Sequence, residues 1–161
     1  MKPERILVPL DGSSLAESAL PVAVDLLAGR PNSTLLLLRA AEALAFLGDP
    51  IEAQVQVVRE AEEYLDAVRA RLAGSGVAEV KTSVCYGPAA SFIIETAQVA
   101  KADMIVMTTH GRSGLRRLVF GSVAEAVLRG TRTPILLIRD AAAPLHMPAG
   151  SDAAMREVSH V

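Results

Sequence analysis

The chain has 161 residues, of which 51% are hydrophobic and 21% charged, a composition that supports one compact domain and is not that of a disordered chain. With 16 basic and 18 acidic residues, the net charge of −2 excludes a strongly basic protein that binds nucleic acid by neutralising phosphates. Charged residues interrupt every apolar run before the roughly 18 residues that a membrane span needs. The single cysteine excludes an internal disulfide, and the lack of an N-terminal apolar signal region predicts a cytoplasmic location.

The first predicted elements are a strand, a tight loop and a helix. The apolar run Arg5–Pro9 predicts a buried strand, and the polar residues 11–13 that follow it predict the loop. Ser14 and Glu17 have the spacing of a capping box, so an amphipathic helix is expected to begin at Ser14. We expect Pro21 to bend this helix.

The middle of the chain predicts two more strands separated by the longest helix. The apolar run Thr34–Leu38 is too short for a helix and predicts a strand buried on both faces. The partly alternating segment Val77–Cys85 predicts a strand nearer the edge of the sheet. Asp49 and Pro50 start the long helix between them. Its apolar stripe, which we expect to pack in the core, consists of Ile51, Val55, Val58, Leu65, Val68 and Leu72.

The last third of the chain repeats this alternation. A helix is expected after Gly87, and the apolar runs Asp103–Met107 and Pro134–Ile138 predict the fourth and fifth strands. Ser122 and Glu125 again have the spacing of a capping box, which predicts the start of the helix between these strands. The residues of this helix expected to face inward are Val123, Val127 and Leu128.

Strands that alternate with helices predict an α/β fold in which crossover helices cover both faces of a parallel sheet. Five strands of this length fit a doubly wound sheet of order 3-2-1-4-5, whose switch point lies between the first and fourth strands. We expect this domain to comprise residues 1–139. Residues 140–161 are dominated by Ala, Pro, Gly and Ser without periodicity, which predicts a mobile tail.

Ligands of such sheets bind at the switch point, so the loops after the first and fourth strands are the candidate site. Asp11 comes directly after the first strand, where its carboxylate can accept hydrogen bonds from hydroxyl or amino groups. The loop after the fourth strand is rich in glycine and leads into a helix N-terminus at Ser122, a combination that suits a phosphate. Arg112 adds a positive charge to this loop.

Structural roles are open for several of these residues. Asp11 could cap its own loop, although the pairing of Ser14 with Glu17 favours a ligand role. Ser122 could serve as the N-cap of its helix as well as a phosphate contact. His110 most simply orients its loop through a hydrogen bond to the backbone, because the sequence shows no partner for general-base chemistry.

The two separated motifs together resemble the universal stress protein family over about residues 4–139. They are Val8-Pro9-Leu10-Asp11-Gly12-Ser13 and Thr109-His110-Gly111, followed after nine residues by Gly121-Ser122-Val123. The resemblance implies a five-stranded α/β fold, a homodimer and, as in one branch of the family, ATP binding through a glycine pattern.

The resemblance also implies roles for individual residues. Asp11 would contact ribose or adenine, and the backbone near Pro9 and Ala40 would border the base. The family's first glycine is Thr108 here, near the ribose, so a β-branched side chain would narrow the pocket or alter the backbone geometry. Phosphates would be held at the glycine loop and the helix start. The full set of candidate site residues is Pro9, Leu10, Asp11, Ala40, Thr108, His110, Gly111, Arg112, Gly121, Ser122 and Val123.

We therefore expect a cytoplasmic regulatory protein that binds ATP, with Mg²⁺ held by phosphates and water, and that hydrolyses ATP slowly at most. The alternative is a dimeric interaction module with an empty pocket. Either protein would form a homodimer through the apolar edge strand 134–138. A flavin-binding protein of the same topology is a weaker alternative, because the few aromatic residues form no ring-stacking loop.

Overall fold

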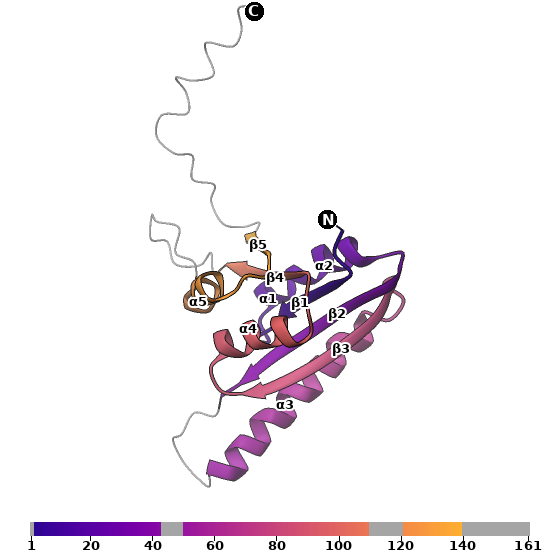
Figure 1. Ribbon diagram of the computed structural model, residues 1–161. Coiled ribbons are helices and arrows are strands. Elements are labelled where there is room, and N and C mark those ends of the chain that lie inside the picture. Colours follow the sequence, from indigo (N-terminus) through magenta and orange to yellow (C-terminus); the bar gives the residue numbers. More distant parts are fainter. Residues whose placement is uncertain (1, 43–49, 110–120, 140–161) are drawn as a thin grey trace, which may run out of the picture.

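The computed structural model describes residues 2–42, 50–109 and 121–139, which form one five-stranded parallel sheet flanked by helices (Figure 1). The strand order is β3-β2-β1-β4-β5, and every adjacent pair is parallel. The strands are β1 (Arg5–Pro9), β2 (Arg30–Ala41), β3 (Val77–Tyr86), β4 (Met104–Thr109) and β5 (Ile135–Arg139). The predicted fold class and strand order are confirmed.

The helices cover both faces of the sheet, and each face has its own apolar core. On one face, side chains such as Leu37 and Leu65 join the cluster formed with the first three helices. On the other face, Leu38 and Ile93 belong to the second cluster. Successive side chains of a strand point to opposite faces, so neighbours on β2 enter different cores. The helices are α1 (Ser14–Glu17), α2 (Ala19–Leu27), α3 (Pro50–Arg71), α4 (Ala89–Val99) and α5 (Ser122–Gly130).

The helix predicted from Ser14 is two helices, and the interruption falls at Ser18 rather than at Pro21. A proline lacks the N–H for an intrahelical bond, and its ring clashes with the carbonyl of the residue four positions earlier, here Glu17. The chain therefore restarts at α2, where Pro21 sits in the first turn and its missing N–H costs little.

The apolar stripe of α3 is buried only in the second half of the helix. Leu65 and Val68 are fully buried against the sheet, whereas Ile51 is 72% exposed and Val55 61% exposed. Figure 1 shows why, because the first turns of α3 extend beyond the ends of β2 and β3. The prediction that the whole stripe packs in the core is wrong for these two residues. Periodicity defines the apolar side of a helix but not the length over which another element covers it.

Two further expectations concern α5 and the C-terminal segment. Leu128 does not face inward as predicted, since its side chain is 47% exposed, while Val127 is buried. The expected tail, residues 140–161, lies outside the described residues. Within the described ranges, no helix is long and apolar enough to cross a membrane.

Candidate functional site

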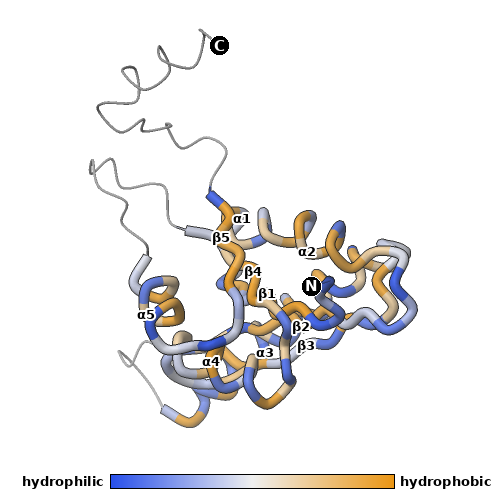
Figure 2. Tube along the Cα trace, turned by 45° about the horizontal axis from the view of Figure 1, so that its top comes forward, coloured by the Kyte–Doolittle hydropathy of each residue, from blue (hydrophilic) through white to orange (hydrophobic). Residues whose placement is uncertain are grey.

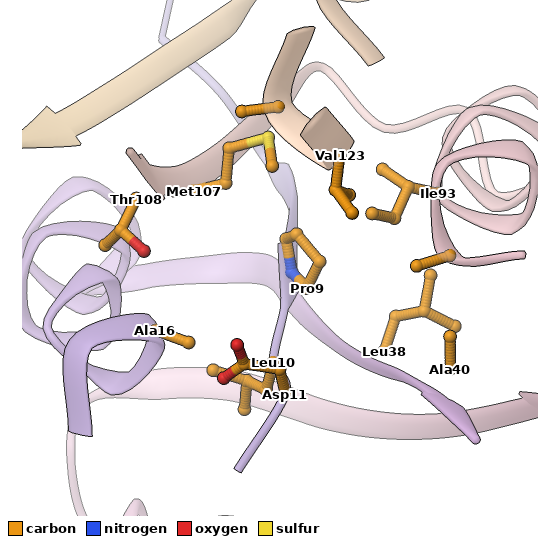
Figure 3. A pocket seen from close by; sticks show the side chains of 12 residues that line it. Pro9, Leu10, Asp11, Ala16, Leu38, Ala40, Ile93, Met107, Thr108 and Val123 are labelled. Atoms are coloured by element: carbon orange, nitrogen blue, oxygen red, sulfur yellow. The ribbon is translucent and has the colours of Figure 1, made fainter. Parts of the chain in front are cut away.

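The switch point of the sheet lies between β1 and β4, which are neighbours in the sheet. After β1 the chain enters α1 and α2 on one face, and after β4 it enters α5 on the other face. The diverging connections leave a cavity of about 120 Å³ at the carboxyl ends of the strands (Figure 3). Its lining consists of Pro9, Leu10, Asp11, Ala16, Leu38, Ala40, Ala89, Ile93, Met107, Thr108, Val123 and Ala124.

The lining has a polar side and an apolar side. Asp11 and Thr108 carry its side-chain oxygens, and in Figure 3 both are separated from Ile93 and Ala40 by Pro9. A mostly apolar cavity with a few convergent polar groups is typical of sites for small organic ligands.

The structure brings together six of the eleven candidate site residues in this lining: Pro9, Leu10, Asp11, Ala40, Thr108 and Val123. Gly121 and Ser122 do not line the cavity but lie at the start of α5, directly before Val123. Three further candidates, His110, Gly111 and Arg112, lie outside the described residues.

Half of the lining was not singled out from the sequence, namely Ala16, Leu38, Ala89, Ile93, Met107 and Ala124. All six are small or apolar and belong to elements whose core positions the periodicity predicts. The available signal was positional, because Ala89 and Ile93 lie in the first turns of the helix that starts at the carboxyl edge of β3. To recognise these residues as part of a site, one also has to know where the helices cross the sheet.

The loop that carries Asp11 has a defined conformation. Leu10 N donates a hydrogen bond to Leu38 O at 2.8 Å, which extends the β1–β2 pairing by one residue. Asp11 Oδ1 accepts a hydrogen bond from Ser13 N at 2.9 Å, and Gly12 has a φ of +88°, which glycine adopts without strain. Asp11 thus shapes its own turn, while its carboxylate has several acceptor positions and can bind a ligand group as well.

The N-cap of α1 is Ser13, not Ser14. Ser13 Oγ accepts a hydrogen bond from Ala16 N at 3.1 Å, which satisfies one of the amides at the start of the helix. Glu17 turns away from the N-terminus and bonds Arg71 instead. The predicted capping box is therefore wrong, and with it the argument that Ser14 relieves Asp11 of a structural role.

The second predicted capping box, at the start of α5, is also wrong. The N-cap is Gly121, which makes no side-chain hydrogen bond, and Ser122 is the first helical residue with an exposed side chain. Glu125 bonds Arg129 one turn later, with Oε1 2.8 Å from Nη2. Ser122 is therefore not the N-cap of α5. Because the N-cap is a glycine, no N-cap side chain covers the backbone amides at the start of this helix.

A polar network joins α1 to α3 on the face of the sheet that α3 covers. Glu17 Oε1 accepts hydrogen bonds from Arg71 Nη2 and from Tyr64 Oη, both at 2.9 Å. The bond from Arg71 holds the pKa of the Glu17 carboxyl below its usual value of 4.5, against the opposing effect of partial burial. Burial, followed by the bond to Glu17, raises the pKa of Tyr64 above its usual value of 10, which favours the protonated hydroxyl that donates this bond.

We expect Glu17→Gln to reduce the free energy of unfolding by about 1 kcal/mol at pH 7, because the amide keeps an acceptor but loses the charge that Arg71 binds. The folded pKa of Glu17 is lowered, so its contribution is complete above pH 4.5 and disappears as the pH falls below 4.5 through the folded pKa. Urea denaturation of both proteins across this range measures the difference. A difference that is constant with pH would contradict the assigned ionisation.

Comparison with known proteins identifies the family. The sequence pattern of the universal stress protein family matches residues 3–139. A universal stress protein from Methanocaldococcus jannaschii is 30% identical over 141 residues, which cover 84% of this chain and 82% of the relative. The chain belongs to the universal stress protein family.

Solved structures of the family have the same architecture. A universal stress protein family member from Burkholderia pseudomallei is 31% identical, with a TM-score of 0.65, and the match covers 84% of this chain and 95% of that protein. A universal stress protein in complex with cAMP matches with a TM-score of 0.67 at 20% identity, covering 86% of this chain and 98% of the other. A family member from Arabidopsis thaliana with AMP bound matches with a TM-score of 0.62 at 15% identity, covering 87% and 94%.

Proposed function

We propose that this protein binds an adenine nucleotide, ATP in particular, at the switch-point cavity and acts as a cytoplasmic regulatory protein of stress responses. The observation that carries the proposal is the position of this cavity, with an apolar interior, a carboxylate at one side and a helix N-terminus next to its lining. A nucleotide has an aromatic base with apolar faces, a hydroxylated ribose and anionic phosphates, and the cavity together with the adjacent helix start offers a matching surface to each.

The apolar side suits the base. Leu38, Ala40 and Ile93 belong to this side (Figure 3). A dry cavity of about 150 Å³ is enough to bind one aromatic ring, so about 120 Å³ suits part of a base rather than a whole nucleotide. Pairing between β1 and β2 ends at Leu38, and Ala40 lies two residues further. The N–H and C=O groups of Ala40 that point to the β1 side are therefore not used by β1 and are placed to form hydrogen bonds with the edge of the base.

The polar side suits the sugar and the phosphates. The Asp11 carboxylate can accept hydrogen bonds from ribose hydroxyls, and the Thr108 hydroxyl can donate or accept one. The amides at the start of α5 and the Ser122 hydroxyl can bind phosphate oxygens, assisted by the positive end of the helix dipole. Gly111 would complete the proposed phosphate side, as the family motif implies, and Arg112 would add a positive charge near it.

The relatives support the class of ligand. Two family members with the same fold hold adenine nucleotides, one cAMP and the other AMP. The two nucleotides share adenine and ribose and differ in their phosphate arrangement. The preference for ATP is proposed here from the helix start and the glycine motif.

A magnesium ion would reach the site with the phosphates. The described residues contain no group of three or more His, Cys, Asp or Glu side chains that could hold a metal ion. Among the described lining residues, Asp11 is the one ionisable group, so phosphate oxygens and water would supply the coordination of Mg²⁺. We expect ATP hydrolysis that is slow at most, because rapid phosphoryl transfer needs a positioned nucleophile and a cationic clamp.

Calorimetric titration of the nucleotide-free protein with ATP and Mg²⁺, and with AMP, tests the proposal. We expect saturable binding of ATP with a dissociation constant on the order of micromolar, and weaker binding of AMP because it makes fewer phosphate contacts. Equal affinities would remove the proposed phosphate site. No binding of either nucleotide would overturn the proposed function.

We further propose that the protein is a homodimer that pairs through β5. This strand lies at one edge of the sheet, and its sequence Ile-Leu-Leu-Ile-Arg is half-buried and apolar up to Arg139 (Figure 2). The opposite edge strand, β3, has Glu79 and Lys81 joined by an ion pair of 3.2 Å, and charges of this kind protect an edge from pairing. Sedimentation showing a monomer at micromolar concentration would contradict the dimer.

A second candidate is a dimeric interaction module that binds no nucleotide. The observation in its favour is Thr108, whose β-branched side chain occupies the lining where the family motif has glycine. Thr108→Gly discriminates the two candidates. If the protein is an interaction module, the wild-type protein does not bind ATP and only the Thr108→Gly variant does. If it is a nucleotide-binding protein, the wild-type protein already binds ATP.

A further inference from the structure

Arg39 lies between two residues of the cavity lining but points away from the cavity. It follows Leu38 and precedes Ala40 on β2, and the alternation of a strand directs its side chain to the face covered by α3. There the guanidinium carbon lies 4.6 Å from the centroid of the Tyr64 ring. A cation at this distance from an aromatic face is attracted to it.

The Arg39 guanidinium also lies next to the Asp11 loop. A Cβ atom placed on Gly12 would lie 3.4 Å from Arg39 Nη2 and 3.5 Å from both Cζ and Nη1. Because these three distances are nearly equal, the flat face of the guanidinium rests against Gly12. Arg39 therefore lies close to both the Tyr64 ring and the backbone of the loop.

Tyr64 is itself fixed in place. Its hydroxyl donates to Glu17 Oε1, the same atom that accepts from Arg71 Nη2. Glu17 belongs to α1, whose N-cap Ser13 is the last residue of the Asp11 loop. The contacts thus connect the loop through Arg39 to α3 and return through Glu17 to the helix that follows the loop.

We propose that Arg39 is a positioning residue for the nucleotide site, holding the loop Leu10–Ser13 so that Asp11 faces the ribose of the ligand. This inference rests on the proposed function. Gly12 sits in the left-handed region at a φ of +88°, and glycine has a wide range of alternative conformations. The flat guanidinium limits the backbone conformations of Gly12 from one side. A smaller or more flexible side chain at position 39 would not limit them in this way.

The test compares Arg39→Met and Arg39→Lys by calorimetric titration with ATP and with an ATP analogue that lacks the 2′- and 3′-hydroxyls. We expect Arg39→Met to weaken ATP binding about fivefold to tenfold and to leave the analogue nearly unaffected, and we expect the same pattern for Asp11→Asn, which removes the carboxylate itself. Arg39→Lys keeps the charge without the plane and should be intermediate. The matched control is Arg59→Met, which removes an exposed arginine from α3 and should change neither affinity.

Equal losses for ATP and the analogue would show a general effect on the fold and would overturn the proposal, as would an unchanged ATP affinity. Hydrogen exchange of the Ser13 amide, which bonds Asp11, gives a readout without nucleotide. We expect faster exchange in Arg39→Met than in the wild-type protein or Arg59→Met. Equal exchange overturns the role of Arg39 even where ATP binds, whereas faster exchange in a chain that binds no ATP overturns only the proposed function.

Discussion

Gly121→Val should weaken ATP binding by about tenfold to a hundredfold and leave the protein folded. Gly121 is the N-cap of α5, and a valine there covers the amides that the proposed phosphates approach, at a cost typical of lost hydrogen bonds to a charged group. The φ of −54° at Gly121 is accessible to any L-residue, so valine introduces no backbone strain. Titration with ATP and circular dichroism measure the two effects.

Ala126→Val is the matched control for this variant. Ala126 lies on the same helix with an exposed side chain, and it does not line the cavity. The added valine should therefore leave ATP affinity unchanged. Unchanged affinity in Gly121→Val as well would remove the helix start from the phosphate site.

Leu65→Ala should lower the free energy of unfolding by about 2–5 kcal/mol. Leu65 is fully buried where α3 packs against the sheet, and its truncation leaves a cavity in that core. Val55→Ala on the same helix should change the free energy by no more than about 0.5 kcal/mol, because Val55 is exposed beyond the end of the sheet. Urea denaturation of both variants gives the comparison.

A large loss for Val55→Ala would be informative in a different way. It would show that the first turns of α3 are covered in solution, by a second copy of the chain for example. Repeating the denaturation at several protein concentrations shows whether a second copy provides this cover, since the stability of an associated protein depends on concentration.

The fold could be predicted from the sequence because it depends on patterns that repeat along the chain. Short apolar runs separated by helical periodicity define crossover units, and the handedness of those units leaves few strand orders. The place of the candidate site follows from the same patterns, since Asp11 comes shortly after the end of β1 at the switch point, whereas Thr108 was singled out only through the family motif. Whether those residues bind a nucleotide is a matter for the titrations.

The two capping-box predictions failed because they depend on which partner a side chain finds in space. Glu17 has the spacing of a capping box with Ser14, yet its partner Arg71 lies 54 residues away on α3. Glu125 likewise fits a capping box with Ser122 but bonds Arg129. In both helices the N-cap is one residue earlier than predicted, at Ser13 and Gly121. A sequence shows which local bonds are available, and tertiary packing decides which of them form.

Tyr64 also gives the protein an intrinsic optical probe. The chain has no tryptophan and two tyrosines, so its near-ultraviolet absorption and fluorescence come mainly from Tyr64 and Tyr86. Tyr64 lies against Arg39 on one side of the Asp11 loop and bonds a carboxylate, an environment unlike that of the half-exposed Tyr86. Movement of this loop should therefore change the tyrosine spectrum of the unlabelled protein, and Tyr86→Phe would isolate the Tyr64 signal.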